Sequence, residues 1–354
     1  MKRTRLILAI AAAALALTMT SCEGNKHNEE AKNPDILFLN NGNWGDNNAC
    51  ISLLDLEDKL VVPEAFFTAN SMHLGDLGQD MILNGEELYI AVNGSQVVFV
   101  TDKNLKIKTT VVANADDMKL SPRSFALANG KVYVTYYEGY LGEINPAAGY
   151  SVRVTKVGPN PEGVAYAGGK LYVANSGGYV KGFWNTVSVV DAASFKETAT
   201  ITVNSNPAAV VANASGTTVY VSSLGNYADK LPMVQAISTA DGKVGNLDYE
   251  NVSGIAGGKG DKLYVLCGGY DEKYNPLPGT IYVHNAANNT KAGKLGATTV
   301  PSAYSISADP ARDFVFVGSS DYVNSGDMYV FDLKGPLLGK FDSKGLNPIK
   351  GLCL

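Results

Sequence analysis

The sequence predicts an all-β fold, a seven-bladed β-propeller with four-stranded blades, in which the C-terminal strand pairs with the N-terminal blade and closes the ring. A short segment of aromatic and β-branched residues occurs seven times, at intervals of about 40 to 50 residues, which is the spacing of propeller blades. Turns rich in glycine and asparagine separate the segments. The chain ends with one additional strand-like segment.

The repeated segment is expected to be the second strand, strand B, of each blade. Valine, isoleucine and leucine surround one aromatic residue in most copies, a composition typical of buried strands. The seven central residues are Phe38, Tyr89, Tyr133, Tyr172, Tyr220, Tyr264 and Phe316.

The other three strands of each blade follow from the residues around strand B. A short apolar segment, strand A, precedes most B strands and often starts with proline, as at Pro122, Pro161 and Pro207. The pairs Asn129–Gly130 and Gly168–Gly169 lie between strands A and B and suit type I′ turns, which need positive φ at both residues. Third and fourth strands, C and D, follow strand B, as in "VSVVD" and "TATITV".

The two ends of the chain predict how the ring closes. No proline-led strand precedes Phe38, yet the chain finishes with "NPIKGLCL" from Asn347, a copy of strand A with no strand B after it. This segment is expected to pair beside Ile36–Leu39 and so remove the exposed edges of an open sheet. A long β-sandwich or two separate β domains explain neither the seven repeats nor the additional strand.

The N-terminus has the layout of a bacterial lipoprotein signal. Three basic residues precede an apolar stretch from Leu6 to Leu17, and small residues lead to Cys22. The stretch is short for a membrane span, which needs about 20 residues. We therefore expect a signal peptide at 1–21, a flexible tether at 22–35 that is lipid-anchored through Cys22, and the propeller at 36–354.

Composition limits the function. The formal net charge of −5 and the lack of a basic cluster argue against nucleic acid as a partner. Apart from Cys22, the cysteines are Cys50, Cys267 and Cys353, an odd number at no metal-ligand spacing. They are expected to be buried thiols, with one disulfide as the alternative.

Aromatic and amide residues are predicted to gather on one face of the ring. In an up-and-down blade, the B–C loops and the D–A connections emerge on one face, and the A–B and C–D turns on the other. The turns are short, whereas the B–C loops are long and rich in aromatic residues. Such a face suits a flat or polyol-like ligand, with aromatics for apolar contacts and amides or arginine for hydrogen bonds. The candidate binding residues are Asn43, Trp44, Asn47, Arg123, Tyr137, Tyr179, Trp184, Asn185, Tyr227, Tyr270 and Tyr322.

The sequence gives little support for catalysis. Of the three histidines, His27 lies in the tether, His284 lies opposite the aromatic face and His73 alone falls on it. The acidic residues of that face are spread around the ring, although convergence at the central channel stays open. We expect no catalytic residues, no metal and no cofactor; a propeller lyase or lactonase is the less favoured alternative.

Several runs resemble a known family. "LNNGNWGDNNACISLLD", "SPRSFALANGKVYVTYYEG" and "NPEGVAYAGGKLYVANSGG" resemble the YncE-like seven-bladed propellers of Bacteroidetes, and among these the BtuG-type surface lipoproteins. The resemblance covers 36–354 and the lipoprotein start, and Glu29–Glu30 resembles the export signal of such lipoproteins. It implies a protein anchored at the outer cell surface that binds cobalamin or a related corrinoid and delivers it to a TonB-dependent outer-membrane transporter. The alternative is a glycan-binding lipoprotein, because tryptophan and tyrosine platforms with nearby amides also suit sugars.

Overall fold

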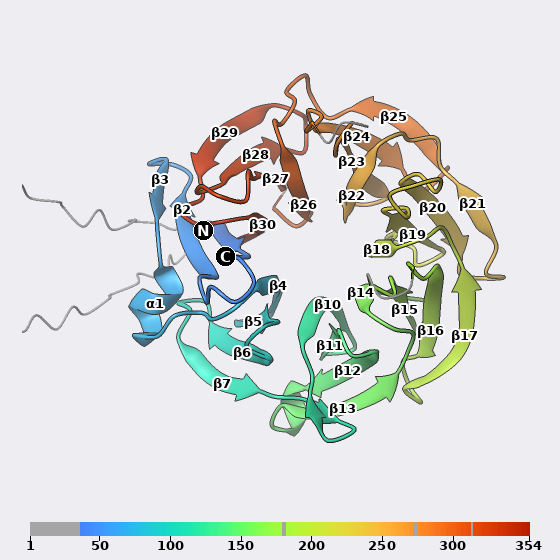
Figure 1. Ribbon diagram of the computed structural model, residues 1–354, viewed down its shortest axis with the longest axis horizontal. Helices are drawn as coiled ribbons and strands as arrows, with labels where there is room; N and C mark the ends of the chain where they lie inside the picture. The colour runs from blue at the N-terminus through green and yellow to red at the C-terminus, as the bar shows by residue number, and fades with distance from the viewer. Residues whose placement is uncertain (1–35, 179–181, 272–274, 313) are drawn as a thin grey trace, which may run out of the picture.

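The computed structural model describes residues 36–178, 182–271, 275–312 and 314–354. They form seven four-stranded antiparallel sheets arranged as blades around a central channel (Figure 1). The predicted seven-bladed propeller is therefore confirmed. The predicted signal peptide, the tether and Cys22 lie outside the described residues, as does the candidate residue Tyr179.

In each blade the strands run in the order A to D from the channel outward (Figure 1). Blades 1 to 4 consist of β30 (Pro348–Cys353), β1 (Ile36–Asn40), β2 (Cys50–Asp55) and β3 (Leu60–Val62); β4 (Gly78–Asn84), β5 (Glu87–Val92), β6 (Val97–Asp102) and β7 (Ile107–Val111); β10 (Pro122–Ala128), β11 (Lys131–Tyr136), β12 (Tyr140–Asn145) and β13 (Ser151–Lys156); and β14 (Pro161–Ala167), β15 (Lys170–Asn175), β16 (Thr186–Asp191) and β17 (Lys196–Thr202).

Blades 5 to 7 repeat the same arrangement. Their strands are β18 (Pro207–Ala212), β19 (Thr218–Ser223), β20 (Met233–Ser238) and β21 (Val244–Asn246); β22 (Val252–Gly257), β23 (Lys262–Cys267), β24 (Thr280–Asn285) and β25 (Thr290–Lys294); and β26 (Ala303–Asp309), β27 (Phe314–Ser319), β28 (Asp327–Asp332) and β29 (Leu337–Asp342).

Two D–A connections contain structure that the sequence did not predict. The connection from blade 1 to blade 2 holds the helix α1 (Ala65–Asn70), and the next one holds a small hairpin of β8 (Asn114–Ala115) and β9 (Met118–Lys119). A 3₁₀ turn, η1 (Pro146–Ala148), follows β12. None of the helices in the described part of the chain is long and apolar enough to cross a membrane.

The hydrophobic core lies between the blades. The central aromatic residues of all seven B strands are buried, as in β11, where Tyr133 exposes 1% of its surface. Strand B is apolar on both of its faces because each face packs against a neighbouring blade. The outer strands β17 and β25 are mostly exposed. The ring is therefore a series of sheets that pack against one another around a central channel.

The C-terminal strand closes the ring as predicted. Strand β30 pairs antiparallel with β1, with Ile36 opposite Cys353 and Phe38 opposite Gly351. Gly351 is required there, because a Cβ atom at this position would lie 2.3 Å from Cγ of Phe316 in blade 7. Lys350 forms an ion pair with Asp80 of β4, which joins the closing strand to blade 2.

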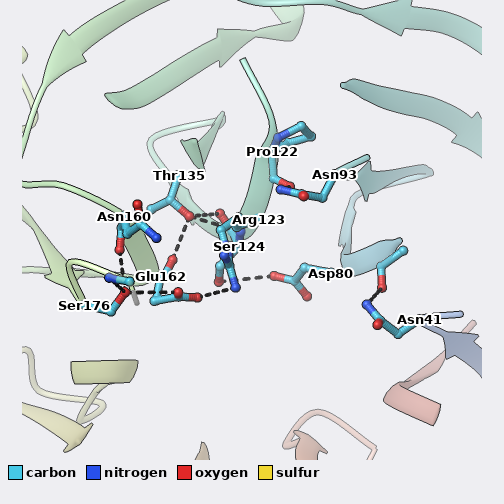
Figure 2. A network of polar contacts seen from close by, with 12 residues as sticks. Asn41, Asp80, Asn93, Pro122, Arg123, Ser124, Thr135, Asn160, Glu162 and Ser176 are labelled. Carbon is cyan, nitrogen blue, oxygen red and sulfur yellow. Dashed lines mark hydrogen bonds and ion pairs between the residues drawn. The ribbon is translucent and has the colours of Figure 1, made fainter. Parts of the chain in front are cut away.

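Side chains at the ends of the B strands hold neighbouring blades together. Asn41 donates from Nδ2 to the carbonyl oxygen of Gly78 at 2.8 Å, and Asn93 donates in the same way to Pro122 at 3.2 Å (Figure 2). In both cases the acceptor is the first residue of strand A in the next blade. Part of the asparagine-rich loop after β1 therefore serves the contact between blades, since Asn41 is buried.

The three remaining cysteines are buried, as expected. Burial raises the pKa of the Cys50 thiol to about 12 and that of Cys267 to about 11. These thiols are protonated near neutral pH, which makes them poor nucleophiles.

A buried histidine joins the outer parts of blades 5 and 6. His284 Nδ1 lies 3.2 Å from the Tyr249 hydroxyl, and its Nε2 lies 3.0 Å from Oδ1 of Asn289. Burial lowers the pKa of His284, and the hydrogen bond with Asn289 partly opposes this effect. The folded state therefore favours the neutral imidazole.

Ring closure predicts a large effect of truncating a side chain in the last strand. Leu352 in β30 is buried in the core between blades 1 and 2, so Leu352→Ala is expected to lower the free energy of unfolding by about 2–5 kcal/mol. Leu338→Ala in the outer strand β29 is the matched control and should change it by less than about 1 kcal/mol. Equal effects in urea unfolding would contradict closure by β30.

The buried histidine predicts acid sensitivity. Because the folded pKa of His284 lies below its ordinary value, the unfolded state binds the proton first as the pH falls below about 6.5. Stability should decline over that range, and less steeply in His284→Gln. The measurement is the free energy of unfolding against pH. An equally steep decline in His284→Gln would contradict this explanation.

Candidate functional site

Exposed apolar side chains gather on one face of the propeller. Those of the described B–C loops are Trp44, Tyr137, Trp184, Tyr227, Leu231, Tyr270, Tyr322 and Val323. The D–A connections on the same face add Phe67, Met72, Val112 and Met118. Across the described A–B and C–D turns, no large apolar side chain is exposed to a comparable degree. The asymmetry that the sequence predicted is therefore present in the structure.

Tyrosines from blades 5 to 7 form a cluster on this face. The rings of Tyr304 and Tyr322 meet edge to face, with centroids 5.6 Å apart. Burial raises the pKa of Tyr322, and a hydrogen bond with Tyr270 and the proximity of Tyr304 and Tyr227 raise it further. Tyr227 in turn packs against Phe183 of blade 4, with ring centroids 5.4 Å apart. We call Tyr227, Tyr270, Tyr304 and Tyr322 the tyrosine cluster.

Two residues of the cluster have backbone conformations that bulky residues seldom adopt. Tyr227 has φ of 57° and Tyr322 has φ of 64°. Such a conformation costs about 1–3 kcal/mol and persists when the surrounding structure fixes it. The Tyr322 amide donates to Oγ of Ser320 at 2.9 Å, and Asp321 accepts from the next two amides. The loop of Tyr322 is therefore held in a shape that presents its ring to solvent.

The predicted residue Arg123 lies at the mouth of the central channel. It follows Pro122 at the start of β10, and Glu162 follows Pro161 at the equivalent position of β14. The guanidinium Nη2 lies 2.7 Å from Glu162 Oε2 (Figure 2), and its Cζ lies 5.6 Å from the centroid of the Tyr137 ring. Both charged side chains expose 22% of their surface.

Glu162 is held by further contacts. Ser176 donates from Oγ to Oε1 at 3.2 Å, and Thr135 donates to the backbone oxygen of Glu162 at 2.6 Å (Figure 2). Burial raises the pKa of Glu162, and the charge of Arg123 and the bond from Ser176 oppose this effect. The carboxyl group is thus fixed in position beside the guanidinium.

The channel below the mouth has a volume of about 440 Å³ and a wall of mixed polar and apolar residues. Asp80 and Lys350 form a second ion pair in this wall, and Asp80 also accepts from the amides of Met81 and Phe125, each at 2.8 Å. Serines and small residues line much of the remainder, including Ser253 of blade 6. The two acidic side chains of the wall, Asp80 and Glu162, and the two basic ones, Arg123 and Lys350, sum to zero net charge.

The loop that carries Trp44 lies at blade 1. Trp44 exposes 74% of its surface. The backbone amide of Gly45 donates to Asp76 at 3.1 Å, and that of Asn43 donates to Asn48 Oδ1 at 2.8 Å. Asn43 Oδ1 also accepts from Asn347, so this amide oxygen serves the loop. The neighbouring candidate Asn47 is exposed, with φ of 53°.

The structure places Trp184 on the outer side of this face. Its side chain lines a groove of about 460 Å³ whose other walls include residues of β13, β16 and β17, the outer strands of blades 3 and 4. Lys156, Glu138 and Glu197 line the same groove. Asn185, next to Trp184, is exposed. Trp184 and its neighbour are thus separate from the channel mouth.

Several acidic residues of the face fix their own loops. Asp321 accepts from the backbone amides of Val323 and Asn324 at 2.9 and 2.7 Å, and these bonds lower its pKa to about 2. Asp271 accepts from Asn275 in the same manner. Within the described part of the chain, no group of three His, Cys, Asp or Glu side chains is arranged to hold a metal ion.

Sequence reasoning missed two residues of the mouth. Tyr304 belongs to strand A of blade 7, and Glu162 is one of the acidic residues that the sequence spreads around the ring. The signal that identifies them is their shared position, the first residue after the start of strand A, which Arg123 also occupies. Aligning the repeats at this position brings the three residues to one level of the channel.

The comparisons with known proteins bear on the fold alone. No family model matches the chain, and no curated protein matches it. Among solved structures, one chain titled "Kuenenia stuttgartiensis Hydrazine Synthase" is similar, with a TM-score of 0.58, 18% identity, and coverage of 71% of this chain and 74% of that one. At this identity the likeness supports the propeller architecture only.

The two tryptophans of the chain allow a test of the loop geometry. Trp44 exposes 74% of its surface and Trp184 exposes 49%. The single-tryptophan variant Trp184→Phe, which keeps Trp44, should be quenched by acrylamide more strongly than Trp44→Phe. Fluorescence quenching of both variants measures this, and equal or reversed quenching constants would contradict the described loop positions.

Proposed function

We propose that the protein is a lipid-anchored lipoprotein of the outer cell surface that binds cobalamin or a related corrinoid on its loop-bearing face. The observation that carries this proposal is the gathering of exposed aromatic side chains on that face, with the tyrosine cluster and Tyr137 beside the channel mouth. The opposite face lacks such side chains among the described residues.

The chemistry of the face matches a flat ligand with a polar edge. Aromatic rings offer large apolar contact area at a small cost in conformational entropy, and the tyrosine hydroxyls add hydrogen bonds. A corrinoid has an apolar macrocycle with amide groups at its edge. The resemblance of the runs around Trp44, Arg123 and Glu162 to the BtuG-type lipoproteins supports the same ligand.

We further propose delivery to a TonB-dependent outer-membrane transporter. The lipoprotein signal ending at Cys22 supports attachment to a membrane beside such a partner. Leu231 and Val323 expose 71% and 76% of their surfaces on the binding face. Exposed apolar residues of this kind are typical of surfaces that contact another protein.

A glycan ligand is the second candidate, and the groove at Trp184 favours it. A tryptophan beside Lys156 and two glutamates offers an apolar platform with hydrogen-bonding groups, which suits a sugar ring. The groove lies outside the channel mouth, so this activity is separable from corrinoid binding by mutation. A glycan array probed with wild type and Trp184→Ala distinguishes the two.

The first experiment is isothermal titration of residues 31–354 with cyanocobalamin and then with cobinamide. We expect one-to-one binding, and the double variant Tyr270→Ala/Tyr322→Ala should weaken it about tenfold or more, because buried aromatic contacts dominate binding energies. Leu338→Ala, at an exposed position in β29, should bind as wild type does.

If the wild-type protein shows no measurable binding of either ligand, corrinoid binding is contradicted. Unchanged affinity in the double variant, with the fold intact by circular dichroism, would show that the tyrosine cluster is not the site.

A further inference from the structure

We propose that Arg123 and Glu162 together recognise a primary carboxamide of the bound ligand, an inference that rests on the corrinoid-binding function proposed above. A primary carboxamide has an acceptor oxygen beside an NH₂ donor. It can accept a hydrogen bond from a guanidinium and donate one to a carboxylate when the two groups are adjacent. Arg123 Nη2 and Glu162 Oε2, 2.7 Å apart at the channel mouth, provide that arrangement.

Both groups keep hydrogen-bonding capacity beyond their contact with each other. A guanidinium has five N–H donors and a carboxylate has about four acceptor sites. Ser176 occupies one site of Glu162, at Oε1. Arg123 Nε is buried and has no hydrogen-bond partner among the described residues. The pair is therefore not saturated by its protein contacts.

The pair is also held in position before any ligand binds. The Tyr137 ring lies against the guanidinium, with 5.6 Å between Cζ and the ring centroid. Ser176 and Thr135 hold the side chain and the backbone of Glu162. Groups fixed in this way lose little conformational entropy on binding, which favours selective recognition.

The charge balance of the channel favours a neutral ligand group over an ion. Asp80 and Lys350 form a second pair in the same wall, so the four charged side chains sum to zero and attract neither an anion nor a cation. A neutral group with an adjacent donor and acceptor needs no such attraction, because it can bond both members of one pair. The acetamide and propionamide arms at the edge of a corrin ring belong to this chemical class.

The test changes the ligand as well as the protein. Cyanocobalamin is compared by isothermal titration with its monocarboxylic acids, in each of which one side-chain amide is hydrolysed to an acid. At least one acid should bind wild type about tenfold or more weakly, because a carboxylate then faces Glu162. In Glu162→Gln the new amide can donate to that carboxylate, so the difference between the two ligands should shrink to about threefold or less.

A matched control is another Arg–Glu pair, which lies within blade 3. Arg153 Nη2 lies 2.8 Å from Glu143 Oε2 on strands β13 and β12, away from the channel wall. Glu143→Gln should leave the ratio of the two affinities as in wild type. Circular dichroism and thermal unfolding check that each variant is folded.

The outcomes separate the inference from the function on which it rests. If wild type binds cyanocobalamin and all the acids equally, or if Glu162→Gln leaves the ratio unchanged, carboxamide recognition by this pair is overturned while corrinoid binding stands. If wild type binds none of these ligands, the proposed function is overturned, and the inference with it.

Discussion

Closure of the ring is the constraint on which the rest of the structure depends. Strand β30 pairs with β1 across nearly the whole length of the chain, and only then is every B strand covered by a blade on each side. The same contact positions the loop that carries Trp44, because Asn347 donates from Nδ2 to the backbone oxygen of Gly42 at 2.9 Å and also to Oδ1 of Asn43. The exposure of Trp44 thus depends on residues that follow it by about 300 positions.

The closed ring separates the residues that stabilise the fold from those of the exposed aromatic face. Burial of the B strands and the hydrogen bonds between blades fix the ends of each B–C loop, so the loops can expose apolar rings without support from a core of their own. The positive φ angles of Tyr227 and Tyr322 show the consequence. A rigid scaffold tolerates unfavourable loop conformations, and such conformations occur often at binding sites.

The fold was predictable because local patterns repeat with the blade, whereas the mouth of the channel depends on contacts between repeats. The position of the aromatic residues on one face of the ring follows from the order of the strands alone. The proximity of Arg123, Glu162 and Tyr304 depends on how strands of different blades align, and no local sequence pattern predicts that alignment. Helix α1 was not predicted because its start lacks the usual sequence signal. Glu64 at its N-cap has a left-handed conformation and makes no capping hydrogen bond through its side chain. Two tyrosines of "YYEGY", Tyr136 and Tyr140, are buried, although they share the loop sequence of exposed Tyr137.

The two ion pairs of the channel differ in what the fold requires of them. Asp80 and Lys350 join blade 2 to the closing strand, so this pair serves ring closure. Arg123 and Glu162 join adjacent blades that the packing of β10 against β14 already connects. The positions equivalent to theirs in blades 5 and 6 are Ala208 and Ser253, and those blades pack without a charge. Partly buried charges cost desolvation free energy that an alanine or serine avoids. A charged pair that the ring does not need, placed beside exposed aromatics at the channel mouth, therefore supports the proposal that Arg123 and Glu162 bind a ligand.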